Sequence, residues 1–92
     1  MKSIICNDKR CFKCGVTYNL HKHHVCEGRN RKNSEKYGLW VYLCGKHHNL
    51  SNEGVHFNKE FDNELKQIGQ KAFEKEYPEL DFLSIFRRRY DK

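Results

Sequence analysis

The stretch from residue 20 to residue 49 decides the fold, because it holds LHKHHV at residues 20–25 and LCGKHHN at residues 43–49. Five of the six histidines lie in these two runs. A neutral imidazole can bind a metal ion or accept a proton near neutral pH. Core packing alone rarely calls for two adjacent His-His pairs. The two runs therefore predict a site of metal or acid–base chemistry.

Length and charge narrow the class of protein. A chain of 92 residues is enough for one domain, but such a short chain often needs a metal or disulfides to stabilise its thin core. Residues 1–50 hold ten Lys or Arg and three acids, whereas residues 51–92 hold eight and nine. The histidine-rich half is thus the basic half, which favours a polyanionic partner over a merely solubilising charge.

The cysteines predict a metal site. There are five, an odd number, and the first residues contain no apolar run typical of a signal peptide or a membrane span. We therefore expect a cytoplasmic protein without membrane contact, in which thiols stay reduced and paired cysteines bind a metal.

A knuckle, CFKCG at residues 11–15, supplies half of a zinc site. Cys44 and His47 repeat the two-residue gap and supply the other half, which predicts a Cys3His zinc site closing a loop of about thirty residues. The alternative, a redox pair, lacks a thioredoxin-like pattern around it. Cys6 is a substitute ligand candidate, and Cys26 is interpreted as a small buried side chain.

The hydrophobic patterns predict an α+β fold. Residues 20–25 and 38–43 are expected to be strands of a hairpin, joined by a polar basic loop at residues 29–34, with a helix from near Cys44. A regular strand points His23 and His24 to opposite faces, so it must end or bulge there, as Gly28 allows.

Two helices are expected in the C-terminal third. Asn58 can cap the first, whose apolar stripe covers the core, and Pro78 ends it and starts the second. The stripes comprise Phe57, Phe61, Leu65, Ile68 and Ala72 in the first helix, and Leu80, Leu83, Phe86 and Tyr90 in the second.

Taken together, these motifs resemble the HNH endonucleases of the ββα-metal, or His-Me finger, superfamily. They are Cys11-x-x-Cys14, residues 20–25, and Leu43-Cys44-x-x-His47-His48. The chain is similar to small HNH proteins of bacteriophages and prophages of Gram-positive bacteria. The resemblance implies one HNH domain over residues 1–92, with a zinc-stabilised ββα core at about 8–57 and the two helices at about 58–90.

The resemblance also implies roles for single residues. His24 is the general base, His23 and His48 bind the catalytic ion, and His47 stands where the family often has the fourth zinc cysteine. The family's middle Asn falls on Leu39 here. Asn30 or Asn33 takes its place, and Asn30 is preferred.

Alternatives for the histidines follow from their positions. His23 and His24 could instead bind structural zinc, and His47 and His48 could exchange roles, since neighbouring helical residues point about 100° apart. His21 is interpreted as an exposed strand residue. His56 is a candidate third ligand of the catalytic ion or a phosphate contact, and Asn52 competes with it as a ligand.

The predicted function is a metal-dependent DNA endonuclease. The family's products carry 3′ hydroxyl and 5′ phosphate ends, and Mg²⁺ or another divalent ion such as Mn²⁺ is the expected catalytic metal beside the structural Zn²⁺. Low sequence specificity on double-stranded DNA is expected, in the host cytoplasm if a phage encodes the protein; a homodimer is an open option. The alternative is a non-catalytic zinc-stabilised DNA-binding or assembly protein. The candidate phosphate contacts, each of which could also be a solvated loop residue, are Arg29, Arg31, Lys32 and Lys36.

Overall fold

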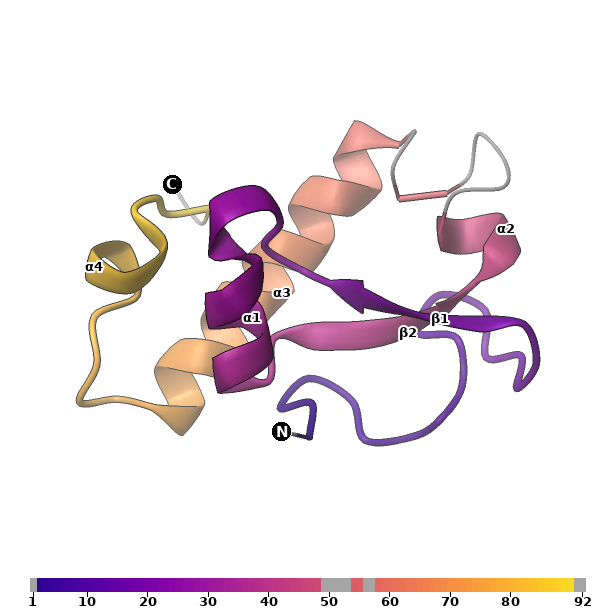
Figure 1. The fold of residues 1–92 in the computed structure, drawn as a ribbon, viewed down its shortest axis with the longest axis horizontal. Coiled ribbons are helices and arrows are strands. Elements are labelled where there is room, and N and C mark those ends of the chain that lie inside the picture. The colour runs from indigo at the N-terminus through magenta and orange to yellow at the C-terminus, as the bar shows by residue number, and fades with distance from the viewer. Residues whose placement is uncertain (1, 49–53, 56–57, 91–92) are drawn as a thin grey trace.

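The fold is a small α+β arrangement around a two-stranded sheet, seen in a computed structural model that describes residues 2–48, 54–55 and 58–90 (Figure 1). No helix within these ranges is long and apolar enough to cross a membrane. The described elements, in chain order, are β1 (Leu20–His24), the 3-10 helix η1 (Gly28–Asn30), α1 (Arg31–Tyr37), β2 (Trp40–Cys44), α2 (Gly45–His48), α3 (Lys59–Glu76) and α4 (Phe82–Phe86).

Strands β1 and β2 pair antiparallel, with Leu20 opposite Cys44 and His24 opposite Trp40. The strand β1 ends at His24, where the sequence analysis expected the strand to end or bulge. The next residue, Val25, donates its backbone N–H to Leu39 O at 2.9 Å. Because β2 runs directly into α2, the end of β2 and the first turn of α2 lie beside the start of β1.

The connection between the strands differs from the predicted basic loop, and the strands form no tight hairpin. Residues 28–37 form η1 and α1, which stand over one end of the sheet in Figure 1. The helix α1 ends at Gly38, whose φ of 76° is left-handed, a conformation that glycine adopts without strain. The polar composition of residues 29–34 predicts a loop, whereas in the structure these residues belong to η1 and α1, with their basic side chains exposed to solvent.

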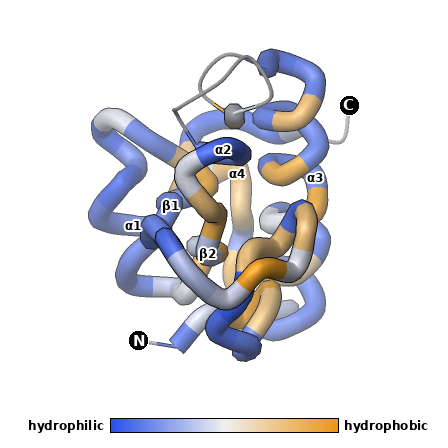
Figure 2. Tube along the Cα trace, turned by 90° about the vertical axis from the view of Figure 1, so that its right-hand side faces the viewer, coloured by the Kyte–Doolittle hydropathy of each residue, from blue (hydrophilic) through white to orange (hydrophobic). Residues whose placement is uncertain are grey.

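The helix α3 begins as predicted, because the Asn58 side chain accepts a hydrogen bond from Phe61 N at 3.0 Å. Its buried residues include Phe61, Leu65 and Phe73, which join β2 residues such as Val41 in one apolar cluster. Figure 2 shows hydrophobic and hydrophilic turns alternating along α3, as in an amphipathic helix. The helix α3 thus packs its apolar face against the sheet.

The last helix buries a different set of residues from the predicted set. The helix α4 is shorter than expected, and it buries Phe82 and Phe86, which stack with ring centroids 4.5 Å apart. Leu80 and Leu83, predicted to face inward, are 36% and 46% exposed. The reason is that residues 78–81 form a turn, so the helix starts at Phe82 and the buried face is set from there.

Candidate metal centre and histidine pocket

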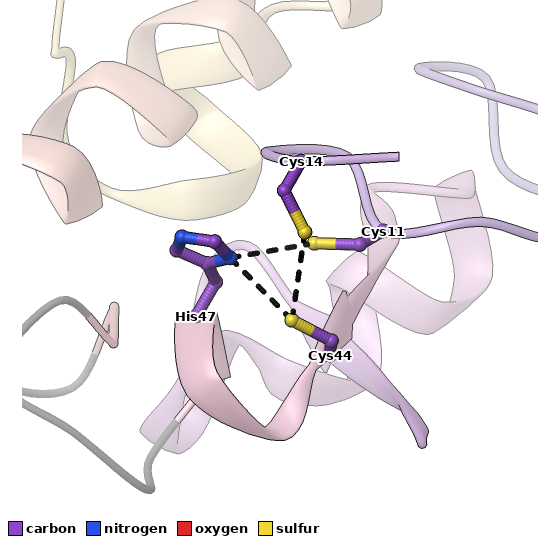
Figure 3. Close-up of side chains that lie close together, drawn as sticks. All are labelled: Cys11, Cys14, Cys44 and His47. Carbon is purple, nitrogen blue, oxygen red and sulfur yellow. Dashed lines mark hydrogen bonds between the residues drawn. The ribbon is translucent and has the colours of Figure 1, made fainter. Parts of the chain in front are cut away.

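Four side chains converge at one end of the sheet. Cys11 and Cys14 come from the knuckle, Cys44 from the last position of β2 and His47 from α2. Figure 3 shows that all four point toward a common centre. Their ligand atoms all lie within 4.8 Å of one another, and in the described part of the chain no other group of three or more His, Cys, Asp or Glu is this close.

The distances fit one tetrahedral ion. Zn–S and Zn–N bonds of about 2.3 and 2.1 Å place two sulfurs about 3.8 Å apart, and a sulfur and a nitrogen about 3.6 Å apart. Cys14 Sγ lies 3.7 Å from Cys44 Sγ. His47 Nδ1 lies 3.4 Å from Cys44 Sγ and 3.8 Å from Cys11 Sγ. The predicted Cys3His set is therefore brought together and could hold a metal such as zinc.

The backbone of the knuckle favours the thiolate form at Cys11. Burial raises the pKa of the Cys11 thiol, but hydrogen bonds from the backbone of Cys44, Cys14 and Lys13 outweigh burial and lower the pKa to about 6. At Cys14 a backbone hydrogen bond at Val16 lowers the pKa, yet desolvation and the two neighbouring thiols raise it above its usual value. Because of this difference in pKa, Cys11 is a thiolate near neutral pH while Cys14 is a thiol. A cysteine must be deprotonated to bind a metal, so Cys11 is ready to act as a ligand.

The remaining two cysteines lie outside this cluster. Burial raises the pKa of the Cys26 thiol to about 11, so Cys26 stays protonated. Its backbone N–H donates a hydrogen bond to Ser34 Oγ at 3.0 Å, and Ser34 Oγ donates one to the Cys26 carbonyl oxygen at 2.8 Å. Cys26 is thus a small buried side chain, as predicted. Cys6, the substitute ligand candidate, is half-buried and is not among the four converging ligands.

His48, the neighbour of His47, faces a second site. An open depression of about 310 Å³ is lined by His23, His24 and His48, together with Lys22, Glu27, Gly28 and Arg31. His47 lies with the cysteines because adjacent residues of α2 point in different directions. The three histidines predicted to act together therefore line one pocket, separate from the metal centre.

His24 is held by a carboxylate. Its Nε2 lies 2.7 Å from Glu35 Oε1, and Glu35 also accepts hydrogen bonds from Lys22 Nζ. The hydrogen bond from Lys22, and then that from His24, lower the pKa of the Glu35 carboxyl to about 2. An ionised carboxylate only accepts, so the proton of this hydrogen bond belongs to Nε2. The lone pair of neutral His24 is then on Nδ1, which accepts a long hydrogen bond of 3.5 Å from Arg31 Nε.

Glu35 is the functional candidate that sequence reasoning missed. It lies in α1, four residues after Arg31 and directly after residues 29–34, which the sequence predicted as a loop. A signal was present, because Glu35 is the one acidic residue between Glu27 and Glu53 in a basic stretch. Only the position of α1 over the end of β1 brings this carboxylate to His24.

His21 also differs from its interpretation as an exposed residue. It is half-buried, and its Nδ1 lies 2.9 Å from His48 Nδ1. The rings of His23 and His48 have centroids 5.4 Å apart. His48 therefore lies against two histidines that project from the same face of β1.

The asparagines predicted to orient His24 are placed elsewhere. Asn30 Nδ2 donates to Phe86 O at 3.0 Å, and Asn33 Nδ2 donates to Ile85 O at 3.2 Å. Both amides thus tie α1 to the carbonyl end of α4. The other ligand candidates, Asn52 and His56, lie outside the described residues.

The four candidate phosphate contacts are exposed residues of η1 and α1. Among them, Arg31 lines the histidine pocket. Lys36 instead lies over the Tyr37 ring, with Nζ 5.3 Å from the centroid. Arg29, Arg31, Lys32 and Lys36 are thus exposed cations on η1 and α1, and of these four Arg31 lines the pocket.

A scan of protein-family models and searches of curated proteins and of solved structures found no match to this chain. The fold and the converging ligands define the chain as a small α+β protein with a Cys3His site that could hold a metal such as zinc.

Proposed function

We propose that this protein is a metal-dependent HNH endonuclease that hydrolyses DNA phosphodiester bonds, with His24 as its general base. The single observation that carries the proposal is the His24–Glu35 hydrogen bond of 2.7 Å beside His23 and His48 in one open pocket. The Cys3His cluster already provides a site for a structural zinc. Stabilisation of the fold by zinc therefore gives no reason for three further histidines in one pocket.

The β1–β2–α2 order supports assigning the ββα-metal core to these elements. The strand β1 supplies His23 and His24, and α2 follows β2 directly and supplies His48. The Cys3His cluster would hold a structural zinc beneath this arrangement. In the proposed core, a structural zinc site with four protein ligands is thus separate from an open pocket that water can enter.

His23 and His48 are the residues that would hold the catalytic ion. An ion about 2.1 Å from each ligating nitrogen lies about 3.2 Å from each ring centre, so two ligating rings have centroids roughly 4.5–5.5 Å apart. The observed 5.4 Å fits this range. When bound, Mg²⁺, Mn²⁺ or another divalent ion supplies positive charge to the scissile phosphate and to the leaving 3′ oxygen.

His24 would take the proton from the attacking water. Glu35 keeps the ring proton on Nε2 and stabilises the imidazolium that forms. Once Arg31 turns from Nδ1 to the phosphate, the Nδ1 lone pair accepts the proton of the water. The water oxygen forms a bond to phosphorus as the bond from phosphorus to the 3′ oxygen breaks. The leaving oxygen then gains a proton from solvent, which gives 3′ hydroxyl and 5′ phosphate ends. We propose Glu35 as the residue that orients His24, in place of Asn30.

Arg31 is the proposed first phosphate contact. Its guanidinium lies at the pocket beside Nδ1, where it would bind a non-bridging oxygen of the phosphate. Arg29, Lys32 and Lys36 would contact neighbouring phosphates from the exposed surface of η1 and α1. Contacts to the backbone alone predict binding of double-stranded DNA with little sequence preference.

Plasmid cleavage tests the proposal. Zinc-loaded wild-type protein with Mg²⁺ or Mn²⁺ should nick or linearise supercoiled plasmid, and a ligase should reseal the ends without repair. His24→Ala should cleave about 10²–10⁴-fold more slowly, because it loses the general base. Zinc content and Tm should stay near those of the wild type.

Lys59→Ala is the control for this assay, since it removes one exposed positive charge outside the basic half and should cleave at the wild-type rate. Equal cleavage by the wild type and His24→Ala would remove His24 from the mechanism. Absence of cleavage by the wild type with every divalent ion would favour the alternative, a zinc-stabilised DNA-binding protein.

A further inference from the structure

We propose that His21 is a positioning residue that accepts a hydrogen bond from His48 and thereby selects the tautomer in which His48 binds the catalytic ion. The inference rests on the proposed function and deepens it. Its starting point is the distance of 2.9 Å between the two Nδ1 atoms, a short separation for two nitrogens that are not bonded to one another.

One of the two nitrogens must carry a proton. Two neutral imidazoles with Nδ1 lone pairs facing each other at this distance would repel, and two Nδ1 protons would collide. A hydrogen bond therefore requires one ring with hydrogen on Nδ1 and the other with hydrogen on Nε2. The ring planes are nearly perpendicular, at 87°, so the contact is an edge contact rather than a stack.

The pocket decides which ring donates. His48 lines the pocket together with His23, whereas His21 is not among the residues that line it. His21 thus contacts His48 without lining the pocket itself. A neutral imidazole has one lone pair, so His48 can present Nε2 to an ion in the pocket only when Nδ1 carries its hydrogen. That hydrogen is then donated to His21 Nδ1.

The backbone explains why this pairing is stable. His21 and His23 are two residues apart in β1 and project from the same face of the strand. His48 lies at the end of α2, which is joined directly to β2, so its ring is brought against that face. Histidine ligands of metals usually donate their second ring N–H to an acceptor, and loss of the acceptor typically weakens metal binding 10–100-fold.

The first measurement detects the tautomers without any catalytic ion. Long-range ¹H–¹⁵N NMR correlations are recorded on zinc-loaded protein at alkaline pH, where the imidazoles are neutral. We expect His48 with hydrogen on Nδ1 and His21 with hydrogen on Nε2. In His21→Ala, His48 should shift toward the tautomer with hydrogen on Nε2, and in His21→Asn it should return, because the amide oxygen can replace Nδ1 as the acceptor.

The second measurement is calorimetric titration of Mn²⁺ into the same zinc-loaded proteins. His21→Ala should bind Mn²⁺ about 10–100-fold more weakly than the wild type, and His21→Asn should recover most of this loss. Lys59→Ala is the control, because it removes an exposed side chain of α3 that does not line the pocket and should therefore keep wild-type Mn²⁺ affinity. Zinc content and Tm, measured for each variant, show that the variants are folded.

Distinct results overturn the inference and the nuclease proposal. A His48 ring with hydrogen on Nε2 in the wild type would overturn the role of His21 and leave plasmid cleavage untouched. Loss of Mn²⁺ binding in both His21 variants, equal to that of His48→Ala, would make His21 a ligand and overturn its positioning role. A wild type that neither cleaves plasmid nor binds Mn²⁺ would overturn the nuclease proposal and this inference together.

Discussion

At the scale of single residues, the charge balance of the histidine pocket depends on Glu35. Its Oε1 lies 2.7 Å from His24 Nε2 and 2.9 Å from Lys22 Nζ. Lys22 is itself placed over Trp40, with Nζ 4.3 Å from the ring centroid. A carboxylate held between two donors stays ionised at any pH at which the imidazole is neutral. Glu35 can therefore act as a fixed acceptor while His24 gains and loses its proton.

The lowered pKa of Glu35 predicts how stability depends on pH. The carboxyl has a pKa of about 2 in the folded protein and an ordinary value of 4.5, so the folded state binds fewer protons between these values. The stabilisation by Glu35 should be complete above pH about 4.5 and should be lost as the pH falls toward about 2. Urea unfolding of the wild type and Glu35→Gln over this range measures the difference.

In that experiment the unfolding free energies of the two proteins should converge as the pH falls from about 4.5 toward about 2. Zinc content is measured at each pH, because acid also protonates the cysteines in both proteins. A difference that persists unchanged at the lowest pH would contradict the lowered pKa of Glu35.

At the scale of elements, β1 serves two groups of residues with its two faces. His21 and His23 on one face contact His48 of α2, while Lys22 and His24 on the other contact Glu35 of α1. The groups meet because β1 ends at His24, at the pocket. The strand therefore needs helices on both sides, and the exact end of α1 determines where Glu35 lies relative to His24.

Gly38 fixes that end, and its replacement should destabilise the fold. A Cβ at Gly38 would overlap the carbonyl oxygen of Lys2, and φ is 76°. Gly38→Ala should cost about 2–3 kcal/mol, from the left-handed backbone and the displaced N-terminal segment, whose Ile4 N donates to Gly38 O. Thermal unfolding should show Tm lowered by about 10–20 °C.

Gly28→Ala is the matched control for the element scale. Gly28 has a similar φ of 64°, but a Cβ there meets nothing within 4 Å. It should cost about 1 kcal/mol, from the backbone conformation alone. If both variants lost the same stability, the contact between Gly38 and Lys2 would have no energetic role.

At the scale of the whole molecule, the Cys3His cluster joins two segments that lie far apart in the chain. It connects the knuckle to the junction of β2 and α2, and Cys11 and Cys44 belong to the same apolar cluster as Phe73, Phe82 and Phe86 of α3 and α4. A domain of this size has only about 5–15 kcal/mol of stability, which is comparable to the binding free energy of a structural zinc. The N-terminal half should therefore depend on the metal more than the C-terminal helices do.

Metal removal tests this dependence. Purified protein should contain one tightly bound zinc per chain, and its removal by a chelator should lower Tm by at least about 15 °C, with loss of the β1–β2 pairing. Cys44→Ala should fail to retain zinc, whereas Cys6→Ser should keep one zinc per chain, because Cys6 lies outside the cluster. A chelator-treated protein with unchanged Tm would show that zinc is not structural.

The Cys3His cluster, the pair of strands and the capped start of α3 could be predicted from the sequence, because each depends on local spacing or local side-chain chemistry. Two cysteines with a two-residue gap bind one ion almost wherever the loop lies, and Asn58 caps its own helix. The phase of α4 could not be predicted, since residues 78–81 can form either a first helical turn or the observed loop.

By itself, the sequence determined which side chains are available for chemistry: the Cys3His set, the two histidine pairs and a basic N-terminal half. Only the tertiary structure decided which atoms meet. The division of His47 and His48 between two sites, the Glu35 carboxylate at His24 and the contact of His21 with His48 depend on strand register and on the position of α1. The physical reason is that a hydrogen bond requires atoms within about 3 Å, and residues distant in the chain reach that separation only through packing.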